Sequence, residues 1–352
     1  MTDIDEMISE REERLRMIRD SAASLTSPDG DLGRVRRLRF SEAGVDRAAW
    51  TEICAMGWPG LRLSEALGGS GLGMAEYAAL LEELGRGLLP EPLIEACLVA
   101  PMLPTEDREA LLSGERLVLP AGIGYEQGAV LPRMRDGKVY GEVAQVVMGA
   151  AADAWLVACE DGLALVEKGA QGLQLTQQPT QDGGHLARLC FNGTEARVLE
   201  VSTAALDEAA LACAAYLVGL MDSAFERTRE YLGVRSQFGQ PIGSFQALQH
   251  RMVDLKIQIE LARAIVAQAA TAIDGNCSAA ECQRRVSTAK VRAAEAAMLV
   301  TRQAIQLHGG IGFTDEADIG LFLRRAMVLL NAQGSLAFHQ SRYLALLQRE
   351  VA

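Results

Sequence analysis

The spacing of apolar residues along the chain changes twice and divides the sequence into three regions. Residues 1 to about 115 are rich in Ala, Leu and Glu, and their apolar positions recur with the 3.6-residue period of an amphipathic helix. In MAEYAALLEELGRGLL, residues 74–89, the apolar side chains at 77, 80, 81 and 84 fall on one face. We therefore expect an N-terminal helical domain over residues 1–115.

A different pattern begins at about residue 116, where short runs rich in β-branched residues replace the helical period. Runs such as KVYGEVAQVVMG and DAWLVACEDGLALVEKG are separated by Gly, Asp and Pro. That alternation is typical of strands joined by turns. The sequence predicts a small antiparallel sheet or barrel over residues 116–200.

Long helical patterns return after residue 200. One predicted helix runs to about Val234, and a second starts after Ser244. A third begins at the capping box SAAE, residues 278–281, and stops at the glycine pair 309–310. Two more amphipathic stretches follow. The complete prediction is a mostly α, α+β protein whose C-terminal region, residues 201–352, forms a four-helix bundle.

Composition and charge narrow the classes of function. The chain has 352 residues, 49% of them hydrophobic, and a formal net charge of −12. Binding to nucleic-acid phosphates needs clustered Lys and Arg, so an acidic chain of this kind argues against a nucleic-acid partner. The charged start, MTDIDEMISEREERLRMIRD, is typical of an amphipathic helix and not of a signal peptide, and no uninterrupted apolar run is long enough to span a bilayer. We expect a cytoplasmic protein with no membrane partner.

The cysteines and histidines do not form recognisable metal or disulfide patterns. The seven cysteines are widely scattered and never spaced C-x-x-C, so the sequence predicts neither a disulfide framework nor a zinc site. The four histidines lack i, i+4 pairing, which makes a protein-bound metal unexpected. The cysteines, interpreted mainly as small core residues, are Cys54, Cys97, Cys159, Cys190, Cys213, Cys277 and Cys282.

Four stretches of the chain carry a resemblance to a known family. GWPGLRLSEALGGSGLGMAEYAALLEELGRGLLPEPL (57–93), ADAWLVA (152–158), RSQFGQPIGSFQALQHRMVDLKIQIELAR (235–263) and AIQLHGGIGFTDEADIGLFLRR (304–325) look like the corresponding parts of acyl-CoA dehydrogenases. The similarity covers nearly the whole chain, and R-x-x-F-G-x-x-[IL]-x-x-[FH]-Q together with Q-x-x-G-G-x-G-[FY] is specific. The resemblance implies FAD as cofactor and an acyl-CoA thioester as substrate, which loses a proton from Cα and a hydride from Cβ.

The resemblance also implies a cofactor-binding set, consisting of Arg235, Phe238, Gln306, Gly309 and Gly310. In the family, the matching residues lie at the subunit boundary and hold the pyrophosphate and adenosine of a FAD whose flavin ring lies in the neighbouring subunit. The residue types suit this task, because a guanidinium forks onto phosphate oxygens and paired glycines let the backbone approach closely. Taken alone, Arg235 would be read as a cation that favours a helix C-terminus.

The sequence departs from the family at the segment 332–335, where family members carry the catalytic glutamate. Counting from the pair Arg324 and Arg325, this segment reads AQGS where the family has Tyr-Glu-Gly-Thr. Gln333 therefore occupies the place of the usual catalytic glutamate. A carboxylate can accept the Cα proton, whereas an amide has no useful basicity, so we expect Gln333 to mark a lost general base.

Some family members carry the base on the first helix of the C-terminal bundle instead. Counting back from Arg235 without gaps places that position at Ala209, just after Asp207 and Glu208. Neighbouring residues of a helix point about 100° apart, so Glu208 would face elsewhere unless the helix start is shifted.

The middle region lacks the usual flavin signatures as well. Family members show T-E-P-x-A-G-S-D and W-[IV]-[TS]-[NG] segments, whereas the matching regions here read GIGYEQGAV, starting at Gly122, and QVVM, residues 145–148. Gln145 and Val147 thus stand where the family places flavin-binding residues. The loss of one half-site explains these differences together with Gln333.

The leading expectation is one subunit of a heteromeric (α2β2) acyl-CoA dehydrogenase that holds the adenosine-diphosphate end of FAD while a complete partner subunit holds the flavin ring, substrate and base. By family analogy, the substrate is a sterol or bile-acid side-chain CoA ester and the electron acceptor resembles electron-transfer flavoprotein. Two alternatives stay open. One is an independently active homo-oligomer with Glu208, Asp207 or Glu126 as base. The other is an FAD-free structural homologue, which the retained cofactor-binding set disfavours.

Overall fold

The computed structural model describes residues 2–26, 30–41, 44–124, 130–200, 205–275 and 277–351, with side chains from residue 10 to 348. The chain separates into two compact units, each built from several segments. The first unit comprises residues 1–33, 73–89 and 210–352, and the second comprises residues 34–72 and 90–209. The division into three domains at residues 115 and 200 stays a prediction from the sequence pattern.

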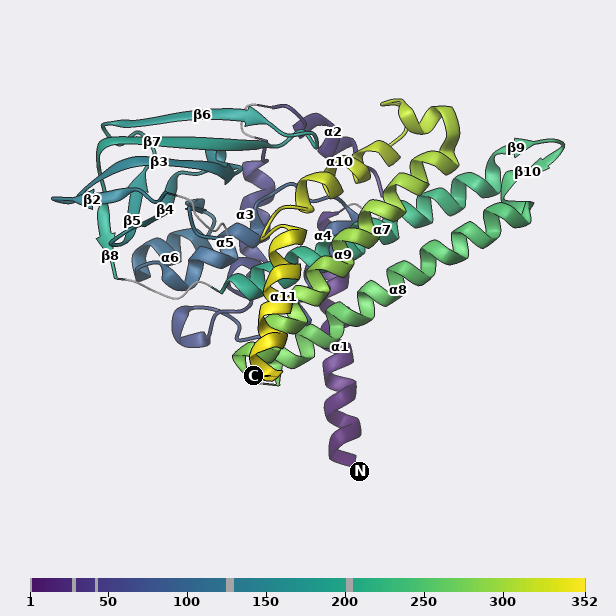
Figure 1. The fold of residues 1–352 in the computed structure, drawn as a ribbon, viewed down its shortest axis with the longest axis horizontal. Helices are drawn as coiled ribbons and strands as arrows, with labels where there is room; N and C mark the ends of the chain where they lie inside the picture. The colour runs from purple at the N-terminus through teal and green to yellow at the C-terminus, as the bar shows by residue number, and fades with distance from the viewer. Residues whose placement is uncertain are drawn as a thin grey trace. The chain divides into compact units, whose positions relative to one another are not determined.

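The first unit is helical, and its helices contain most of the C-terminal region (Figure 1). Its elements are α1 (Thr2–Leu25), α4 (Met74–Arg86), α7 (Leu206–Val234, whose first residues belong to the second unit), β9 (Ser236–Gln237), β10 (Gln240–Pro241), α8 (Gln246–Asp274), α9 (Ala279–His308), α10 (Ile319–Leu329) and α11 (Leu336–Val351). Helices α8 and α9 lie side by side, α11 packs along α9, and the β9–β10 hairpin lies where α7 and α8 are joined. The predicted mostly helical fold with C-terminal helices is confirmed.

Local chemistry explains where these helices begin and end. Ser278 precedes α9, and its hydroxyl oxygen accepts the backbone N–H of Glu281 at 3.3 Å, as the capping box predicts. Gly309 ends α9 with φ of +68°, a left-handed conformation that costs glycine little. Helix α7 ends at Val234 and α8 begins shortly after Ser244, as expected.

Helix α7 is the most apolar of the long helices. By length and composition it could cross a membrane, but 89% of its apolar window is buried inside the protein. Burial of that kind is what a central helix of a bundle requires, because its apolar side chains pack on all sides. The composition of α7 is therefore accounted for by its place in the core.

A buried carboxylate on α7 ties three helices of the first unit together. Asp222 accepts a hydrogen bond from Arg86 of α4 and one from Lys256 of α8 at 3.0 Å, and Arg263 of α8 lies 3.3 Å away. Burial by itself raises the pKa of Asp222, but the three cations outweigh it and hold that pKa below its usual range. Asp222 is therefore charged in the folded state, where it joins α4, α7 and α8.

We expect Asp222→Asn to lower the free energy of unfolding by about 2 to 3 kcal/mol, because it leaves a group of cations without their buried counter-charge. Glu260→Gln is the matched control: Glu260 binds Lys256 and Arg263 from a half-exposed position, so its loss should cost less than about 1 kcal/mol. Since the pKa of Asp222 is depressed on folding, its contribution is present at neutral pH and is lost as the pH falls below about 4. Urea denaturation of both variants at pH 7 and pH 3.5 measures this; equal, small effects at pH 7 would contradict it.

The second unit contains short helices and two four-stranded sheets. The strand orders are β1-β4-β5-β8 and β2-β3-β7-β6. The helices are α2 (Gly33–Leu38), α3 (Arg47–Ala55), α5 (Leu93–Val99) and α6 (Thr105–Leu112). The strands are β1 (Val118–Ala121), β2 (Arg133–Arg135), β3 (Lys138–Val147), β4 (Ala154–Cys159), β5 (Gly162–Glu167), β6 (Leu173–Pro179), β7 (His185–Glu195) and β8 (Arg197–Leu199). The small β region predicted from the sequence is confirmed.

The prediction of a purely antiparallel sheet is wrong in one respect. Strands β1 and β4 pair in parallel, with Val118 opposite Ala154 and Ala121 opposite Val157. Residues 122–153, which contain two further strands of the other sheet, connect them, and a parallel pair requires a crossover connection of that kind. The residue pattern of a strand does not reveal whether it pairs in parallel or antiparallel.

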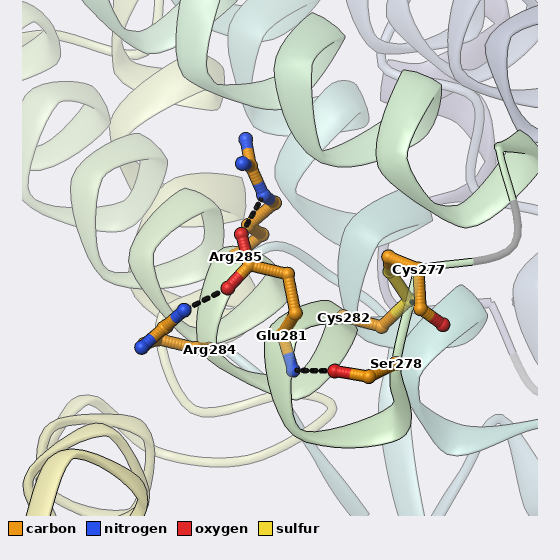
Figure 2. Close-up of a disulfide and its surroundings, with 6 residues drawn as sticks. All are labelled: Cys277, Ser278, Glu281, Cys282, Arg284 and Arg285. Carbon is orange, nitrogen blue, oxygen red and sulfur yellow. Dashed lines mark hydrogen bonds and ion pairs between the residues drawn. A yellow bond between two sulfur atoms is a disulfide. The ribbon is translucent and has the colours of Figure 1, made fainter. Parts of the chain in front are cut away.

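The prediction about cysteines is also wrong for one pair. Cys277 and Cys282 form a disulfide, with Cα atoms 5.8 Å apart, where the chain turns from α8 into α9 (Figure 2). The tight entry into α9 brings together two cysteines whose spacing matches no familiar pattern. The other five cysteines are free thiols, three of them buried in agreement with the prediction.

Candidate functional site

The segment after α7 forms a β-hairpin with a two-residue turn. Two of the predicted cofactor-binding residues, Arg235 and Phe238, lie at its base and in its turn. Strand β9 pairs with β10, and Phe238 and Gly239 make the turn with φ of +54° and +83°. Positive φ at both positions is the signature of a type I′ turn, which strongly prefers Asn or Gly. A bulky residue at such a position is rare, and Phe238 is also 93% exposed. This backbone outlier is consistent with the predicted cofactor-binding role of Phe238.

Backbone hydrogen bonds fix the base of this hairpin. The N–H of Arg235 donates to the carbonyl of Tyr231 at 2.9 Å, and the N–H of Ile242 donates to the carbonyl of Arg235 at 2.8 Å. The rings of Phe238 and Phe245 meet edge to face, with centroids 6.1 Å apart. Arg235 itself is exposed. The hairpin therefore presents a cation and an aromatic ring on a defined backbone.

The C-terminal end of α9 supplies the other three predicted residues. The Gln306 side chain is exposed, and its backbone carbonyl accepts the N–H of Gly309. A Cβ atom added at Gly309 or Gly310 would have no neighbour within 4 Å. Within the described chain, the backbone at these glycines is open to close approach by another molecule.

A pocket of about 430 Å³ joins the two segments. Tyr231 and Val234 of α7 line it together with His308 at the end of α9 and Ile311 beyond it. The rings of Tyr231 and His308 stack almost in parallel, with centroids 4.4 Å apart. The structure thus places the residues just before Arg235 next to those flanking Gly309 and Gly310.

The His308 ring at the end of α9 is uncharged beside the pocket. Burial lowers the pKa of His308, although a hydrogen bond to the carbonyl of Ala304, 2.8 Å from Nδ1, favours protonation. The ring is therefore neutral at physiological pH, with Nδ1–H as the donor. A neutral ring stacks on Tyr231 without placing a charge in a half-buried site.

Exposed apolar side chains lie at the pocket and on the segments next to it. Val234, Phe238 and Phe313 are each more than three quarters exposed, and Ile311 is 41% exposed. We call these four residues the apolar rim. Large apolar side chains that are left exposed are typical of a surface that another protein covers.

These residues fit the adenosine-diphosphate end of FAD. An exposed guanidinium can fork onto phosphate oxygens, the Gln306 amide can bond ribose or phosphate, and the open glycines remove the obstruction that a Cβ would make. The assignment of Arg235, Phe238, Gln306, Gly309 and Gly310 as cofactor-binding residues stays a prediction.

The segment around Gln333 forms a tight loop between α10 and α11, residues 330–335. Gln333 and Gly334 are both left-handed, with φ of +54° and +93°. The hydroxyl of Ser335 accepts the N–H of Phe338 at 3.2 Å, as a helix N-cap does. The 330–335 loop therefore has a defined conformation, with Gln333 in a backbone region that few non-glycine residues adopt.

Two buried side chains hold the carbonyls around this loop. Lys290 of α9 is fully buried and donates to the carbonyls of Leu329 and Leu330 at 3.1 and 3.2 Å. His339 of α11, also fully buried, lies with Nε2 2.9 Å from the carbonyl of Gln333. Burial lowers the pKa of Lys290. Sequence reasoning missed both residues, because one Lys and one His in helical patterns carry no signal of a loop contact.

We expect Gly334→Ala to lower the free energy of unfolding by about 1 to 3 kcal/mol. The change places a side chain at a left-handed position, and its Cβ would lie 2.6 Å from Nε2 of His339. Gly233→Ala is the control, since it lies in α7 with nothing within 4 Å of a new Cβ, and it should be neutral or slightly stabilising. Thermal or urea unfolding measures both; a neutral Gly334→Ala would mean that the loop readily rearranges.

Of the alternative bases, Glu208 is held by an arginine and Glu126 lies outside the described residues. Both carboxylate oxygens of Glu208 accept hydrogen bonds from Arg62, at 2.9 and 2.7 Å, and Arg62 also donates to the carbonyl of Leu72 at 2.9 Å. The guanidinium thus occupies both oxygens with which Glu208 would have to reach a substrate proton. Ala209 is buried, whereas Glu126 falls in a segment that the structure does not describe.

Strand β3 is irregular where the family places flavin-binding residues. Its pairing with β7 shifts register between Val143 and Val146, and Gln145 has φ of +59°. Gln145 is exposed and Val147 is half-buried. Such bulges often re-aim side chains next to functional sites, so this strand differs from a regular one as well as from the family pattern.

Among the residues that the structure describes, no group of three or more His, Cys, Asp or Glu side chains could hold a metal ion. The polar groups gathered at the ends of α7 and α9 are instead a guanidinium, an amide and backbone N–H groups. The guanidinium and the backbone N–H groups favour anions.

Comparison with known proteins agrees with this geometry. The family models for the N-terminal and C-terminal domains of acyl-CoA dehydrogenase match residues 12–104 and 199–343. Acyl-CoA dehydrogenase IpdE2 of Mycobacterium tuberculosis is 34% identical over 315 residues, which are 89% of this chain and 91% of that protein.

Solved structures give the same result for the fold. A variant of the Tcur3481–Tcur3483 steroid ACAD matches with a TM-score of 0.85 and 28% identity, over 97% of this chain and 99% of that one. The ChsE4–ChsE5 complex of Mycobacterium tuberculosis matches with a TM-score of 0.80 and 26% identity, over 97% and 96% of the two chains. The two family models and the relatives together show that the chain belongs to the acyl-CoA dehydrogenase family.

Proposed function

We propose that this chain is the subunit of a heteromeric acyl-CoA dehydrogenase that binds the adenosine-diphosphate end of FAD and has no catalytic base of its own. The observation that carries the proposal is Gln333, an amide in the place of the glutamate, on a loop whose carbonyls Lys290 and His339 hold. The loop is formed, but its side chain at this position carries no basic group. The names of two similar structures, Tcur3481–Tcur3483 and ChsE4–ChsE5, each pair two proteins, which supports a second subunit.

Each residue at the ends of α7 and α9 has a distinct task in this proposal. Arg235 binds the pyrophosphate, and Gln306 bonds phosphate or ribose. Gly309 and Gly310 let the backbone approach the ligand, and Phe238 packs over it and excludes water. When bound, FAD supplies the acceptor for the hydride that leaves Cβ of the acyl-CoA.

Proton removal is assigned to the partner subunit. Gln333 can donate or accept a hydrogen bond but cannot take up the Cα proton. Glu208, the first candidate of the homo-oligomer alternative, is held by Arg62. The surroundings of these two residues support a base outside this chain.

The name of one similar structure supports a substrate class. One of the similar structures is a steroid ACAD, which supports a sterol or bile-acid side-chain CoA ester as substrate of the complex proposed here. The proposed electron acceptor resembles electron-transfer flavoprotein, and the proposed compartment is the cytoplasm. A bulky polycyclic acyl-CoA would be oxidised in preference to butyryl-CoA by the assembled complex.

Co-expression with each acyl-CoA dehydrogenase gene that neighbours this one tests the association. Light scattering should show an α2β2 complex. Phe238→Asp should weaken it by at least about tenfold, because a charge replaces an aromatic group of the apolar rim. Val198→Asp, at a 55% exposed position of β8, is the control and should leave assembly intact. A stable homo-oligomer that ignores every neighbouring gene product would contradict the proposal.

A further inference from the structure

The disulfide closes the N-terminus of α9. Cys277 precedes the N-cap Ser278, and Cys282 lies in the first helical turn, where its N–H donates to the carbonyl of Ser278 at 2.9 Å (Figure 2). Glu281 of the same turn binds Arg284 and Arg285. Both cysteines are half-buried, so the cross-link is within reach of a small thiol or of a dithiol protein.

The next residues of α9 connect this turn to the 330–335 loop. Arg342 of α11 donates to the carbonyl of Gln283 at 3.2 Å and, through Nε, to the hydroxyl of Ser287 at 2.8 Å. Ser287 lies 3.3 Å from Nδ1 of His339, whose Nε2 lies 2.9 Å from the carbonyl of Gln333. Because a carbonyl only accepts, Nε2 carries the proton and Nδ1 accepts the Ser287 O–H.

The buried end of this chain of hydrogen bonds is shielded from water. Ser287 and His339 are almost completely inaccessible to solvent, so water cannot replace their partners without a local opening. Its other end, Gln283, directly follows Cys282. Fraying of the first turn of α9 would therefore remove the Gln283 contact and loosen the hold of α9 on Arg342.

Reduction of the disulfide is chemically balanced by a dithiol. The S–S bond between Cys277 and Cys282 accepts two electrons and two protons and becomes two thiols, while the reductant's two thiols form a disulfide. Reduction also removes the restraint that keeps residues 277–282 closed.

We propose that the Cys277–Cys282 disulfide is a redox-sensitive cross-link that sets the rigidity of the 330–335 loop through Arg342, Ser287 and His339. Oxidised, it fixes the first turn of α9 and so the carbonyl of Gln333. Reduced, it lets that turn fray and the loop opens more often. This coupling does not depend on the proposed function, because its readout is the dynamics of the chain.

Amide hydrogen exchange of the full chain, with and without dithiothreitol, tests the coupling. Reduction should raise exchange about tenfold both in residues 278–287 and in residues 331–339. The C277S/C282S double variant should exchange like the reduced protein and ignore the reductant. Cys97→Ser and Cys190→Ser, at half-buried free thiols, are controls that should keep the response. Exchange that rises only in residues 278–287, or nowhere, would overturn the proposal.

Ser287→Ala separates coupling from general loosening. It removes the hydroxyl between Arg342 and His339, so loop exchange should already be high in the oxidised variant. Reduction should then still raise exchange in residues 278–283 but add less than about twofold in residues 331–339. A full loop response in Ser287→Ala would show that the cross-link acts by another route and would also overturn the proposal.

Discussion

The lone chain should oxidise acyl-CoA at least about a hundredfold more slowly than the assembled complex, as measured by acyl-CoA-dependent dye reduction. General-base catalysis commonly contributes about 10²- to 10⁴-fold, or roughly 3 to 5 kcal/mol of transition-state stabilisation. Gln333 cannot supply it, and Arg62 holds Glu208 in a bidentate pair. The rate difference is thus the expected cost of a missing base.

Variants at the same position sharpen this prediction. Gln333→Glu alone should not activate the lone chain, because Gln145 and Val147 replace the flavin-binding residues and leave the hydride without an oriented acceptor. In the complex, Gln333→Ala should change turnover by less than about twofold, whereas removal of the partner's glutamate should abolish it. The homo-oligomer alternative predicts the reverse: an active lone chain that Glu208→Gln or Asp207→Asn inactivates.

Arg235→Ala should weaken FAD binding by the complex about tenfold to a hundredfold, because a charge-assisted hydrogen bond is worth about 1.5 to 3 kcal/mol. Arg235→Lys should recover part of that loss, since an ammonium keeps the charge but not the bidentate fork. The matched control is Arg229→Ala, which removes an exposed arginine of α7 that pairs with Glu226. Flavin release on dilution measures all three, and unchanged retention in Arg235→Ala would make Arg235 a helix-end cation only.

The sequence was sufficient where structure is set by short-range chemistry. The capping box at Ser278 and Glu281 and the glycine stop at Gly309 are each decided by a few neighbouring atoms, and α9 begins and ends there. The same holds for the apolar face of α4, whose Tyr77 and Leu84 are buried as the period predicts. Patterns of this kind are local, so the sequence displays them directly.

Features that depend on the three-dimensional course of the chain could not be predicted. The parallel pairing of β1 with β4 is set by the route of the intervening chain, and the Cys277–Cys282 disulfide by the geometry of one turn. Lys290 reaches the 330–335 loop from α9, about forty positions earlier in the chain. His339 reaches it from α11, by folding back onto the carbonyl of Gln333. A sequence pattern records none of these distances. The prediction about Gln333 needed no such distances, because an amide in place of the family's glutamate is visible in the sequence.

The flavin content of the chain, purified alone and with its partner, tests the central claim most directly. In the proposed complex the chain contributes one side of the FAD site, so binding energy is divided between two protein surfaces and neither surface alone should hold the cofactor tightly. Flavin absorbance after gel filtration should show about one FAD per heterodimer in the complex and little FAD in the lone chain. Full, tight FAD occupancy of the chain purified alone would contradict the account.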